Sequence, residues 1–259
     1  MKHGTPKTSS IEKALDILMA FSPHNREMGT TDLSSRLRYH PATVNRILQI
    51  LCQKGFLRQN EKSRKFTLGP STFQLGRTIF DSLSGNLVHI STDHLIDLSE
   101  KVGETVVLEV LSHDQVVVTY IAQGNNSHSI GPRIGDRVPI HAAAGAKAML
   151  PFYEPEKVER LLKAPLQRFA PRTITSLEVL RREIEEARRT GVAFCQEEMA
   201  EGVNAVGAPV LDHEGRPVAG VVIAGLASRV KCTTRSPMVR ELKKTAKDIS
   251  VLLFHEERG

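Results

Sequence analysis

Apolar residues recur every three or four positions in three short segments near the N-terminus of this 259-residue chain. The first segment covers residues 11–18, where Ser9 or Ser10 is placed to cap a helix. The second covers residues 31–37, preceded by threonines that can cap it. The third begins at Pro41, which suits the first turn of a helix because it lacks an amide donor, and Gly55 is placed to end it.

Two short runs of alternating apolar and polar residues follow. Residues 56–58 and 65–68 predict paired strands around a polar turn at residues 59–64. Residues 69–83 return to a helical pattern and are expected to form a connector. The order of helix, helix, tight turn, helix and hairpin is that of a winged helix-turn-helix.

The remainder of the chain mixes both periodicities. Helices are expected at residues 87–101, 142–152, 155–163, 176–191 and 236–255. Strands are expected at residues 104–111 and 115–121, which form an antiparallel hairpin, and at residues 192–196, 205–211 and 218–223. Helices combined with a mainly antiparallel sheet make this second part an α+β domain.

The positive charge of the chain is confined to its first third. Residues 1–83 hold 13 Lys and Arg against 6 Asp and Glu, a net charge of +7, whereas residues 84–259 hold 22 against 23, a net charge of −1. This asymmetry favours a polyanionic partner for the first third and a small or neutral one for the rest. A solvated basic surface is the plainer alternative.

Cysteine usage and hydropathy indicate where the protein works. Cys52, Cys195 and Cys232 are widely spaced and odd in number, which favours free thiols in a reducing compartment over a disulfide framework or a zinc site. No run approaches the roughly 18 apolar residues of a membrane helix. The polar first ten residues also lack the apolar core of a signal peptide. We therefore expect a cytoplasmic protein without a membrane partner.

The third helix and the hairpin carry the side chains expected to meet DNA. An α-helix fits the major groove, where Arg pairs with guanine and Asn with adenine. A helix N-terminus favours a phosphate, and cations on the hairpin would release counterions from the duplex. The predicted DNA-binding residues are His40, Thr43, Asn45, Arg46, Gln49, Arg58, Lys62, Arg64 and Lys65. The plainer alternatives are a solvated Asn45 and an Arg46 paired with a nearby carboxylate.

Several stretches resemble the IclR family of bacterial transcription regulators. They include "TTDLSSRLRYHPATVNRILQILCQKGFLRQN", "RVPIHAAAGAKAML" and "EEMAEGVNAVGAPVLDHEGRPVAGVVIAGLASRV". The resemblance covers nearly the whole chain, from Ser9 to His255. It implies a winged helix-turn-helix at residues 1–69, a linker helix at 70–84 and a GAF-like effector-binding domain at 85–259. It also implies dimers or tetramers on double-stranded operator DNA, acting as activators or repressors.

The resemblance also places a small-molecule effector. In the family, the segment matching residues 141–148 offers backbone amides to an acidic ligand, which implies Ala143, Ala144 and Gly145 here. Family members that sense small oxo-acids have polar pocket walls, with an acid at the position of Cys195. The matching positions here are Cys195, Ala205, Val222 and Ala224, to which Ile130, Val138, Met149 and Val203 can add. An apolar wall favours a larger aromatic or alicyclic carboxylate, and plain core packing is the alternative.

Sequence motifs give little support to catalysis, a metal or a cofactor. His141 and Glu197 are a conceivable metal pair, but HxxxH or CxxC spacing is missing. The chain also lacks G-x-S-x-G and G-x-x-x-x-G-K-S/T. We therefore expect no enzyme and no cofactor, and favour a ligand-responsive transcription regulator. The leading alternative is a small-molecule-binding protein whose winged helix mediates protein contacts, ahead of a hydrolase or metal enzyme.

Overall fold

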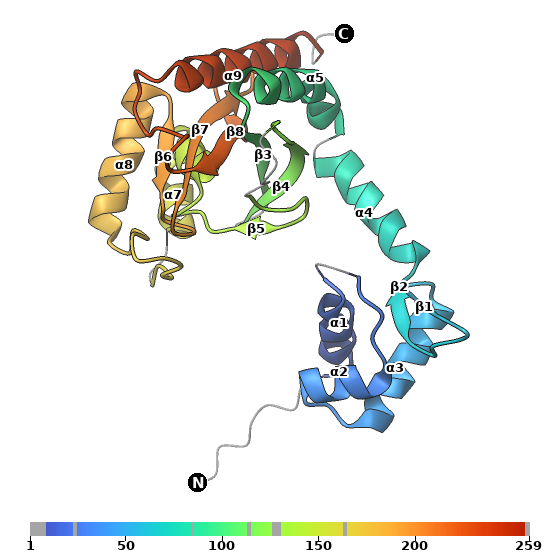
Figure 1. Ribbon diagram of the computed structural model, residues 1–259. Coiled ribbons are helices and arrows are strands. Elements are labelled where there is room, and N and C mark those ends of the chain that lie inside the picture. Colours follow the sequence, from blue (N-terminus) through green and yellow to red (C-terminus); the bar gives the residue numbers. More distant parts are fainter. Residues whose placement is uncertain are drawn as a thin grey trace. The chain divides into compact units, whose positions relative to one another are not determined.

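The computed structural model describes residues 9–22, 25–83, 85–112, 115–125, 131–162 and 165–256. Contacts divide the chain into two compact units, Met1–Asp81 and Ser82–Gly259, and each unit has a hydrophobic core of its own. The first contains helices and a β-hairpin, and the second contains helices and a larger sheet (Figure 1). The predicted α+β fold class is confirmed.

Three helices, a hairpin and most of a further helix, which ends just inside the second unit, form the first unit. They are α1 (Ser10–Ala20), α2 (Thr30–Leu37), α3 (Pro41–Gln53), β1 (Leu57–Gln59), β2 (Phe66–Leu68) and α4 (Pro70–Leu83). Strands β1 and β2 are antiparallel, and a bridge between Met28 and Phe66 adds a third backbone segment to the hairpin. The apolar faces meet in a core that includes Ile17, Leu33, Val44, Leu48 and Phe66.

Local sequence signals set the ends of these helices. Ser9 caps α1, because its Oγ accepts a hydrogen bond from the amide of Glu12 at 3.1 Å while the Glu12 carboxylate accepts one from the Ser9 amide. The threonine cap predicted for α2 is wrong, since both threonines lie inside the helix. Gly29 is the N-cap, and Asp32 accepts its amide proton at 2.9 Å. Gly55 ends α3 as expected, with a φ of 73°.

A six-stranded antiparallel sheet forms the centre of the second unit, in the order β5-β4-β3-β8-β7-β6. The strands are β3 (Thr105–Ser112), β4 (Gln115–Ala122), β5 (Arg137–Val138), β6 (Ala193–Gln196), β7 (Val203–Leu211) and β8 (Pro217–Leu226). The predicted hairpin of β3 and β4 is confirmed by its register, which pairs Ser112 with Gln115. Strand β5 was not predicted, because two residues make no periodic pattern.

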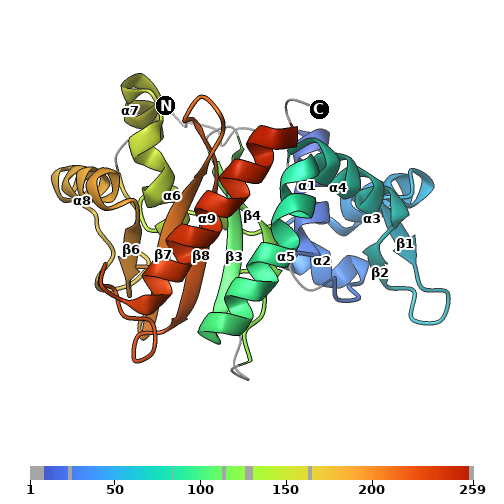
Figure 2. The same cartoon turned by 90° about the horizontal axis from the view of Figure 1, so that it is seen from above.

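Helices cover both faces of this sheet (Figure 2). They are α5 (Gly85–Val102), α6 (Ala144–Met149), α7 (Pro155–Leu161), α8 (Leu177–Thr190) and α9 (Pro237–Glu256), with a 3-10 turn η1 (Leu150–Phe152). Helices α5 and α9 pack together across one face, and α6 lies against β7 and β8 on the other. Strand β3 is therefore buried on both faces over most of its length. Among the described residues, no helix is both long and apolar enough to span a bilayer.

Candidate functional site

Helix α3 has an apolar face in the core of its unit and a polar face in solvent. The buried face consists, as predicted, of Val44, Ile47, Leu48 and Leu51. The solvent face carries the predicted DNA-binding residues Asn45, Arg46 and Gln49, with a half-buried Thr43. Arg46 forms no ion pair or hydrogen bond with any residue that the structure describes, so its N–H donors are available to a partner.

The turn between α2 and α3 fixes the start of α3. Arg38 adopts a left-handed conformation with a φ of 58°, and the Tyr39 hydroxyl donates to the carboxylate of Asp16 in α1. His40 is the N-cap of α3, where its Nδ1 accepts a hydrogen bond from the amide of Ala42 at 3.3 Å. Because Nδ1 is an acceptor, Nε2 carries the proton and remains a donor for a partner such as a phosphate.

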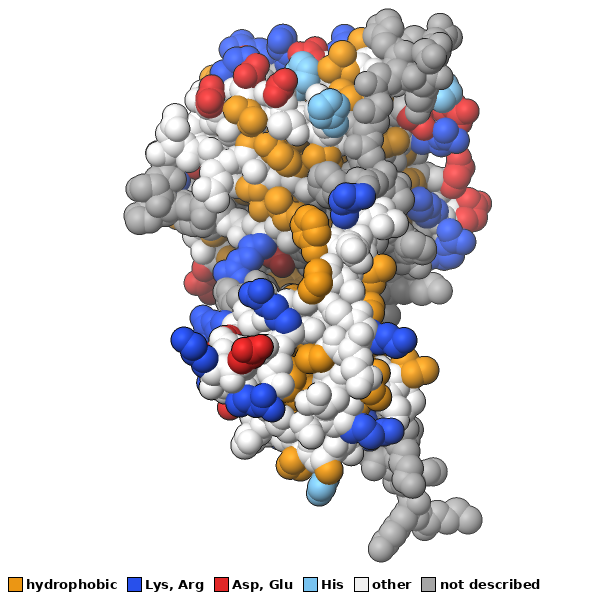
Figure 3. Space-filling view, turned by 90° about the vertical axis from the view of Figure 1, so that its right-hand side faces the viewer, with side chains coloured by type: hydrophobic (Ala, Val, Ile, Leu, Met, Phe, Trp, Pro, Cys, Tyr) orange, Lys and Arg blue, Asp and Glu red, His pale blue; other side chains and the backbone are white. Residues whose placement is uncertain are grey.

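The β1–β2 hairpin carries the other predicted cations, all of them exposed: Arg58, Lys62, Arg64 and Lys65. Arg58 Nε donates to Thr67 Oγ1 on the paired strand at 3.2 Å. Figure 3 shows the β1–β2 side of the molecule, where Lys and Arg side chains gather with few carboxylates between them. This charge distribution suits a polyanionic partner.

Glu27, which no sequence pattern marked, ties the tip of the hairpin to the segment before α2. Its carboxylate accepts from Asn60 Nδ2 at 2.7 Å and from Ser63 Oγ at 3.0 Å, and these hydrogen bonds lower the pKa of Glu27. Asn60 Oδ1 in turn accepts from the backbone amide of Lys62 at 2.9 Å. These hydrogen bonds tie the tip of the hairpin to Glu27, and the charged ends of its Lys and Arg side chains take no part in them.

Most of the predicted effector-binding residues come together on the α6 face of the large sheet. One hydrophobic cluster includes Val138, Ala144, Cys195, Ala205, Val222 and Ala224. An adjoining cluster that shares Val138 includes Ala143 and Met149. Val203, at the start of β7, belongs to neither cluster of described residues. Ile130 lies outside the residues that the structure describes.

The wall of this cluster is apolar, including the thiol of Cys195. Cys195 is only 4% exposed. Burial, followed by the nearby negative charge of Glu198, raises the pKa of the thiol to about 11. The thiol is therefore neutral at physiological pH and contributes no charge to the wall.

Glycines allow the start of α6 to approach the sheet closely. A Cβ atom on Gly207 would stand 2.5 Å from the backbone of Ala144, and one on Gly220 would stand 2.8 Å from the Cα of Gly145. Neither position accepts a side chain without displacing α6, because these separations are shorter than van der Waals contact. The backbone of Ala144 and Gly145 therefore lies directly on β7 and β8.

A buried glutamate, Glu109 on β3, stands beside the start of α6. Burial raises the pKa of Glu109 to about 7, and hydrogen bonding from the backbone amides of Ala146 and Gly145 opposes the rise. Its Oε2 has no hydrogen-bond partner among the described residues, and a Cβ atom on Gly145 would overlap this oxygen. The amide of Gly145, predicted to hold the effector, thus faces a carboxyl group of the protein itself. The sequence signal for Glu109 was a lone acid within an apolar strand.

Lys147, at the centre of α6, is fully buried in an ion-pair network. Its Nζ lies 2.7 Å from Glu198 Oε1 and 2.8 Å from Glu183 Oε2 of α8. Burial disfavours the charged ammonium, but the two carboxylates outweigh this effect and raise the pKa of Lys147. The network fastens α6 to α8 and to the connection between β6 and β7.

The residues considered for a metal site have other partners. His141 Nε2 lies 2.9 Å from the carbonyl oxygen of Gln167, and Glu197 pairs with Arg172 at 3.1 Å. Across the described ranges, no group of three or more His, Cys, Asp or Glu side chains is arranged to hold a metal ion. His141 and Glu197 therefore have structural contacts that account for their positions.

Two family models match this chain and together cover most of it. Residues 82–251 match the C-terminal domain of the bacterial transcriptional regulator IclR, and residues 10–61 match the IclR helix-turn-helix domain. The HTH-type transcriptional regulator XynR of Escherichia coli is 30% identical over 226 residues, which cover 87% of this chain and 89% of XynR.

Solved structures give the same relationship. The Thermotoga maritima IclR aligns with a TM-score of 0.78 and 28% identity, over 94% of this chain and 98% of that one. An IclR homologue from Microbacterium hydrocarbonoxydans, solved in complex with 4-hydroxybenzoate, aligns with a TM-score of 0.80 over 95% of this chain and 99% of that one. At 23% identity, this similarity is one of fold.

Proposed function

Because this chain belongs to the IclR family of bacterial transcriptional regulators, which are DNA-binding proteins and not enzymes, we propose how it recognises its operator and its effector. It binds double-stranded operator DNA in the cytoplasm as a dimer or tetramer, with α3 in the major groove. A small, rather apolar carboxylate bound on the α6 face of the sheet changes operator affinity. The effector can change operator affinity only to the extent that its own affinity differs between the DNA-binding conformation and the other conformations.

The observation that carries the proposal is the solvent face of α3. Arg46 is exposed and has no partner among the described residues, which argues against its alternative role in an internal ion pair. Asn45 and Gln49 flank it on the same exposed face. An unpaired Arg beside two amide side chains, on a helix held by its apolar face, suits the reading of base edges.

Contacts on either side of α3 are assigned to the phosphate backbone. His40 Nε2 remains a donor at the helix N-terminus, where the helix dipole favours an anion. The hairpin cations Lys62, Arg64 and Lys65 are exposed and project from a turn that Glu27 holds. Such contacts position the protein on the duplex and make its affinity depend on salt.

The surface of α1 supports self-association. Ile11, Leu15 and Met19 are 74%, 56% and 64% exposed, and their spacing of four residues places them in one stripe along the helix. Single exposed apolar residues are common, but a continuous stripe on a helix favours a partner surface. We assign this stripe to a second copy of the chain, since a helix-turn-helix dimer brings two recognition helices to its duplex.

The effector is assigned to the apolar clusters around Ala144, Cys195 and Val222. The apolar side chains of these clusters favour an aromatic or alicyclic body over a small oxo-acid, whose polar groups would lose water without replacement. Glu109 has a pKa of about 7, so its protonated form is available to donate a hydrogen bond to a ligand carboxylate. The Microbacterium homologue was solved with an aromatic acid, 4-hydroxybenzoate, which belongs to the proposed chemical class.

A gel-shift measurement on the duplex upstream of the chain's own gene tests this proposal. A shuffled duplex of the same length and base composition is the control. We expect the chain to bind the native duplex more tightly than the shuffled one at physiological salt. Equal binding to both duplexes, or none at low salt with every candidate acid, would favour a winged helix that contacts proteins instead.

A further inference from the structure

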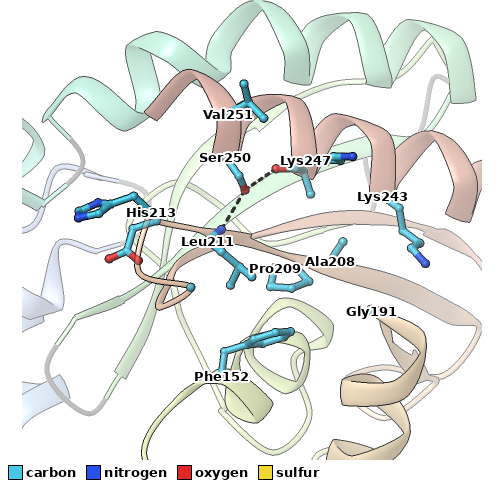
Figure 4. A pocket seen from close by; sticks show the side chains of 13 residues that line it. Phe152, Gly191, Ala208, Pro209, Leu211, His213, Lys243, Lys247, Ser250 and Val251 are labelled. Atoms are coloured by element: carbon cyan, nitrogen blue, oxygen red, sulfur yellow. Dashed lines mark hydrogen bonds between the residues drawn. The ribbon is translucent and has the colours of Figure 1, made fainter. Parts of the chain in front are cut away.

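A cavity of about 550 Å³ opens at one end of strand β7, between α9 and the turn η1 (Figure 4). Its lining includes Phe152, Pro209, Leu211, Lys243, Lys247 and Ser250. None of these residues belongs to the effector clusters around α6. The volume lies within the ~300–1,000 Å³ of sites that hold small molecules.

The cavity exists because β6 is shorter than the strand it pairs with. Strand β6 covers only Asn204 to Gly207 of β7, so residues 208–211 continue beyond it. Pro209 has no amide hydrogen, and the Leu211 amide donates to Ser250 Oγ at 2.9 Å. This edge therefore lacks the row of free donors that an added strand needs, which favours a small molecule over an extended peptide.

The floor of the cavity is apolar. In Figure 4 the ring of Phe152 lies below Pro209 and Leu211. Pro209 and Leu211 are half-buried and Phe152 comes from a different segment, η1. Flat apolar side chains on two sides suit the faces of an aromatic ring.

The rim of the cavity is cationic. Lys243 and Lys247 stand one turn apart on α9, and Lys243 Nζ donates to the carbonyl oxygen of Thr190 at 2.9 Å. Lys247 is exposed and forms no ion pair or hydrogen bond within the described part of the chain. The carboxylate in the lining, Asp212, is paired with Arg216 at 2.8 Å. The rim therefore has an excess of positive charge.

From this combination of floor and rim we propose that the cavity is a second ligand site, specific for aromatic carboxylates. The ring lies against Phe152 and Pro209, and the carboxylate pairs with Lys247 and lies near Lys243. This site is separate from the effector clusters at α6, so its occupancy does not depend on the DNA-binding assignment. Both positive groups belong to α9, which also packs against α5 in the main core.

Binding of 2-naphthoate to the intact chain tests the site. The methyl NMR signals of Leu211, assigned with a Leu211→Val variant, report ring-current shifts at the floor. We expect saturable shifts, and an affinity about five-fold weaker in Lys247→Gln, since an exposed ion pair contributes a modest free energy. Lys244→Gln is the matched control, because Lys244 lies on the same helix, pairs with Asp248 and does not line the cavity.

Three results would overturn the second site. They are shifts of Leu211 that do not saturate, an equal loss of affinity in Lys244→Gln, and 2-naphthylmethanol binding as tightly as 2-naphthoate. The neutral alcohol keeps the ring and removes the charge, so it separates the cationic rim from the apolar floor. Operator binding is measured on the same samples. A protein that binds its operator but fails these ligand tests loses only the second site, and the proposed function stands.

Discussion

The ammonium group of Lys147 lies 2.7 Å from Oε1 of Glu198, and the side chain of Lys147 is completely buried. A second carboxylate, Glu183 Oε2, stands 2.8 Å away on α8. The ion pair between Lys147 and Glu198 links α6, which packs on the effector clusters, to the segment between β6 and β7. The position of the effector clusters thus depends on an internal charge network.

Lys147→Met is expected to destabilise the second unit by about 3–5 kcal/mol, because it leaves the buried carboxylate of Glu198 without its counter-charge. Urea denaturation followed by circular dichroism measures the loss. Arg181→Met is the matched control, since Arg181 pairs with Glu159 at 2.8 Å on the surface, where an ion pair contributes less than about 1 kcal/mol. Similar losses in both variants would contradict the structural role of the buried pair.

The buried carboxyl of Glu109 predicts a pH-dependent stability. Its pKa is raised from 4.5 to about 7 on folding, so the folded chain binds more protons than the unfolded chain in this window and stability falls as pH rises through it. The difference corresponds to about 3 kcal/mol. Glu109→Gln is therefore expected to be more stable than the parent chain at pH 8, with the gain shrinking toward pH 4.5.

Thermal or urea denaturation at several pH values measures this effect. Glu100→Gln provides the control, because Glu100 is exposed on α5. A gain from Glu109→Gln that is the same at pH 5 and pH 8 would show that ionisation of Glu109 is not its cause.

The apolar wall predicts which acids stabilise the second unit. Aromatic acids at 100 times their Kd should stabilise the folded chain by about 2.7 kcal/mol, whereas pyruvate and glyoxylate should have little effect. Thermal-shift measurements compare the two groups. These measurements are made on the Lys247→Gln variant, in which ligand binding to the proposed second cavity is weakened and the α6 clusters are unchanged. Stabilisation by the oxo-acids alone would contradict an apolar effector site.

The stripe on α1 predicts that Leu15→Glu lowers the oligomeric mass. A charge at the centre of an apolar contact would lose water without a partner, so light scattering should show a smaller species than the parent chain. Ser35→Glu introduces the same charge on the exposed surface of α2 and should leave the mass unchanged. A parent chain that is already monomeric, or a mass unaffected by Leu15→Glu, would remove α1 from the interface.

Periodicity predicted the elements that bury one continuous face. The buried set of α3 follows from apolar spacing alone, and Pro41 and Gly55 mark its two ends. The antiparallel hairpin of β3 and β4 follows from two alternating runs joined by a polar turn. These features depend on residues close together in the sequence.

Features that depend on distant residues were not predictable from pattern. Glu27 and Asn60 are 33 positions apart in the sequence, and Lys147 and Glu198 are 51 apart. No local sequence pattern predicts either pair. Glu109 was visible as a lone acid in an apolar run, but its neighbour Gly145 is brought to it only by the packing of α6. The apolar wall residues were grouped through family resemblance, because alternating Val and Ala on strands equally describe plain core.

Arg46 and Lys65 are expected to affect DNA binding in different ways. Lys65→Ala removes a cation from the hairpin and should weaken native and shuffled duplexes alike, with a flatter dependence of affinity on salt. Fluorescence anisotropy at several salt concentrations measures the salt dependence of affinity for the parent chain and for Lys65→Ala. A loss confined to the native duplex would instead place Lys65 against a base.

The ratio of affinities for the native upstream duplex and a shuffled duplex, compared between the parent chain and Arg46→Ala, tests the central claim most directly. Lys54→Ala, at the far end of α3, is the matched control. We predict that the parent chain prefers the native duplex and that Arg46→Ala loses about 1–3 kcal/mol of that preference while Lys54→Ala keeps it. A parent chain without preference, or an Arg46→Ala variant that retains it in full, would contradict recognition of DNA through α3.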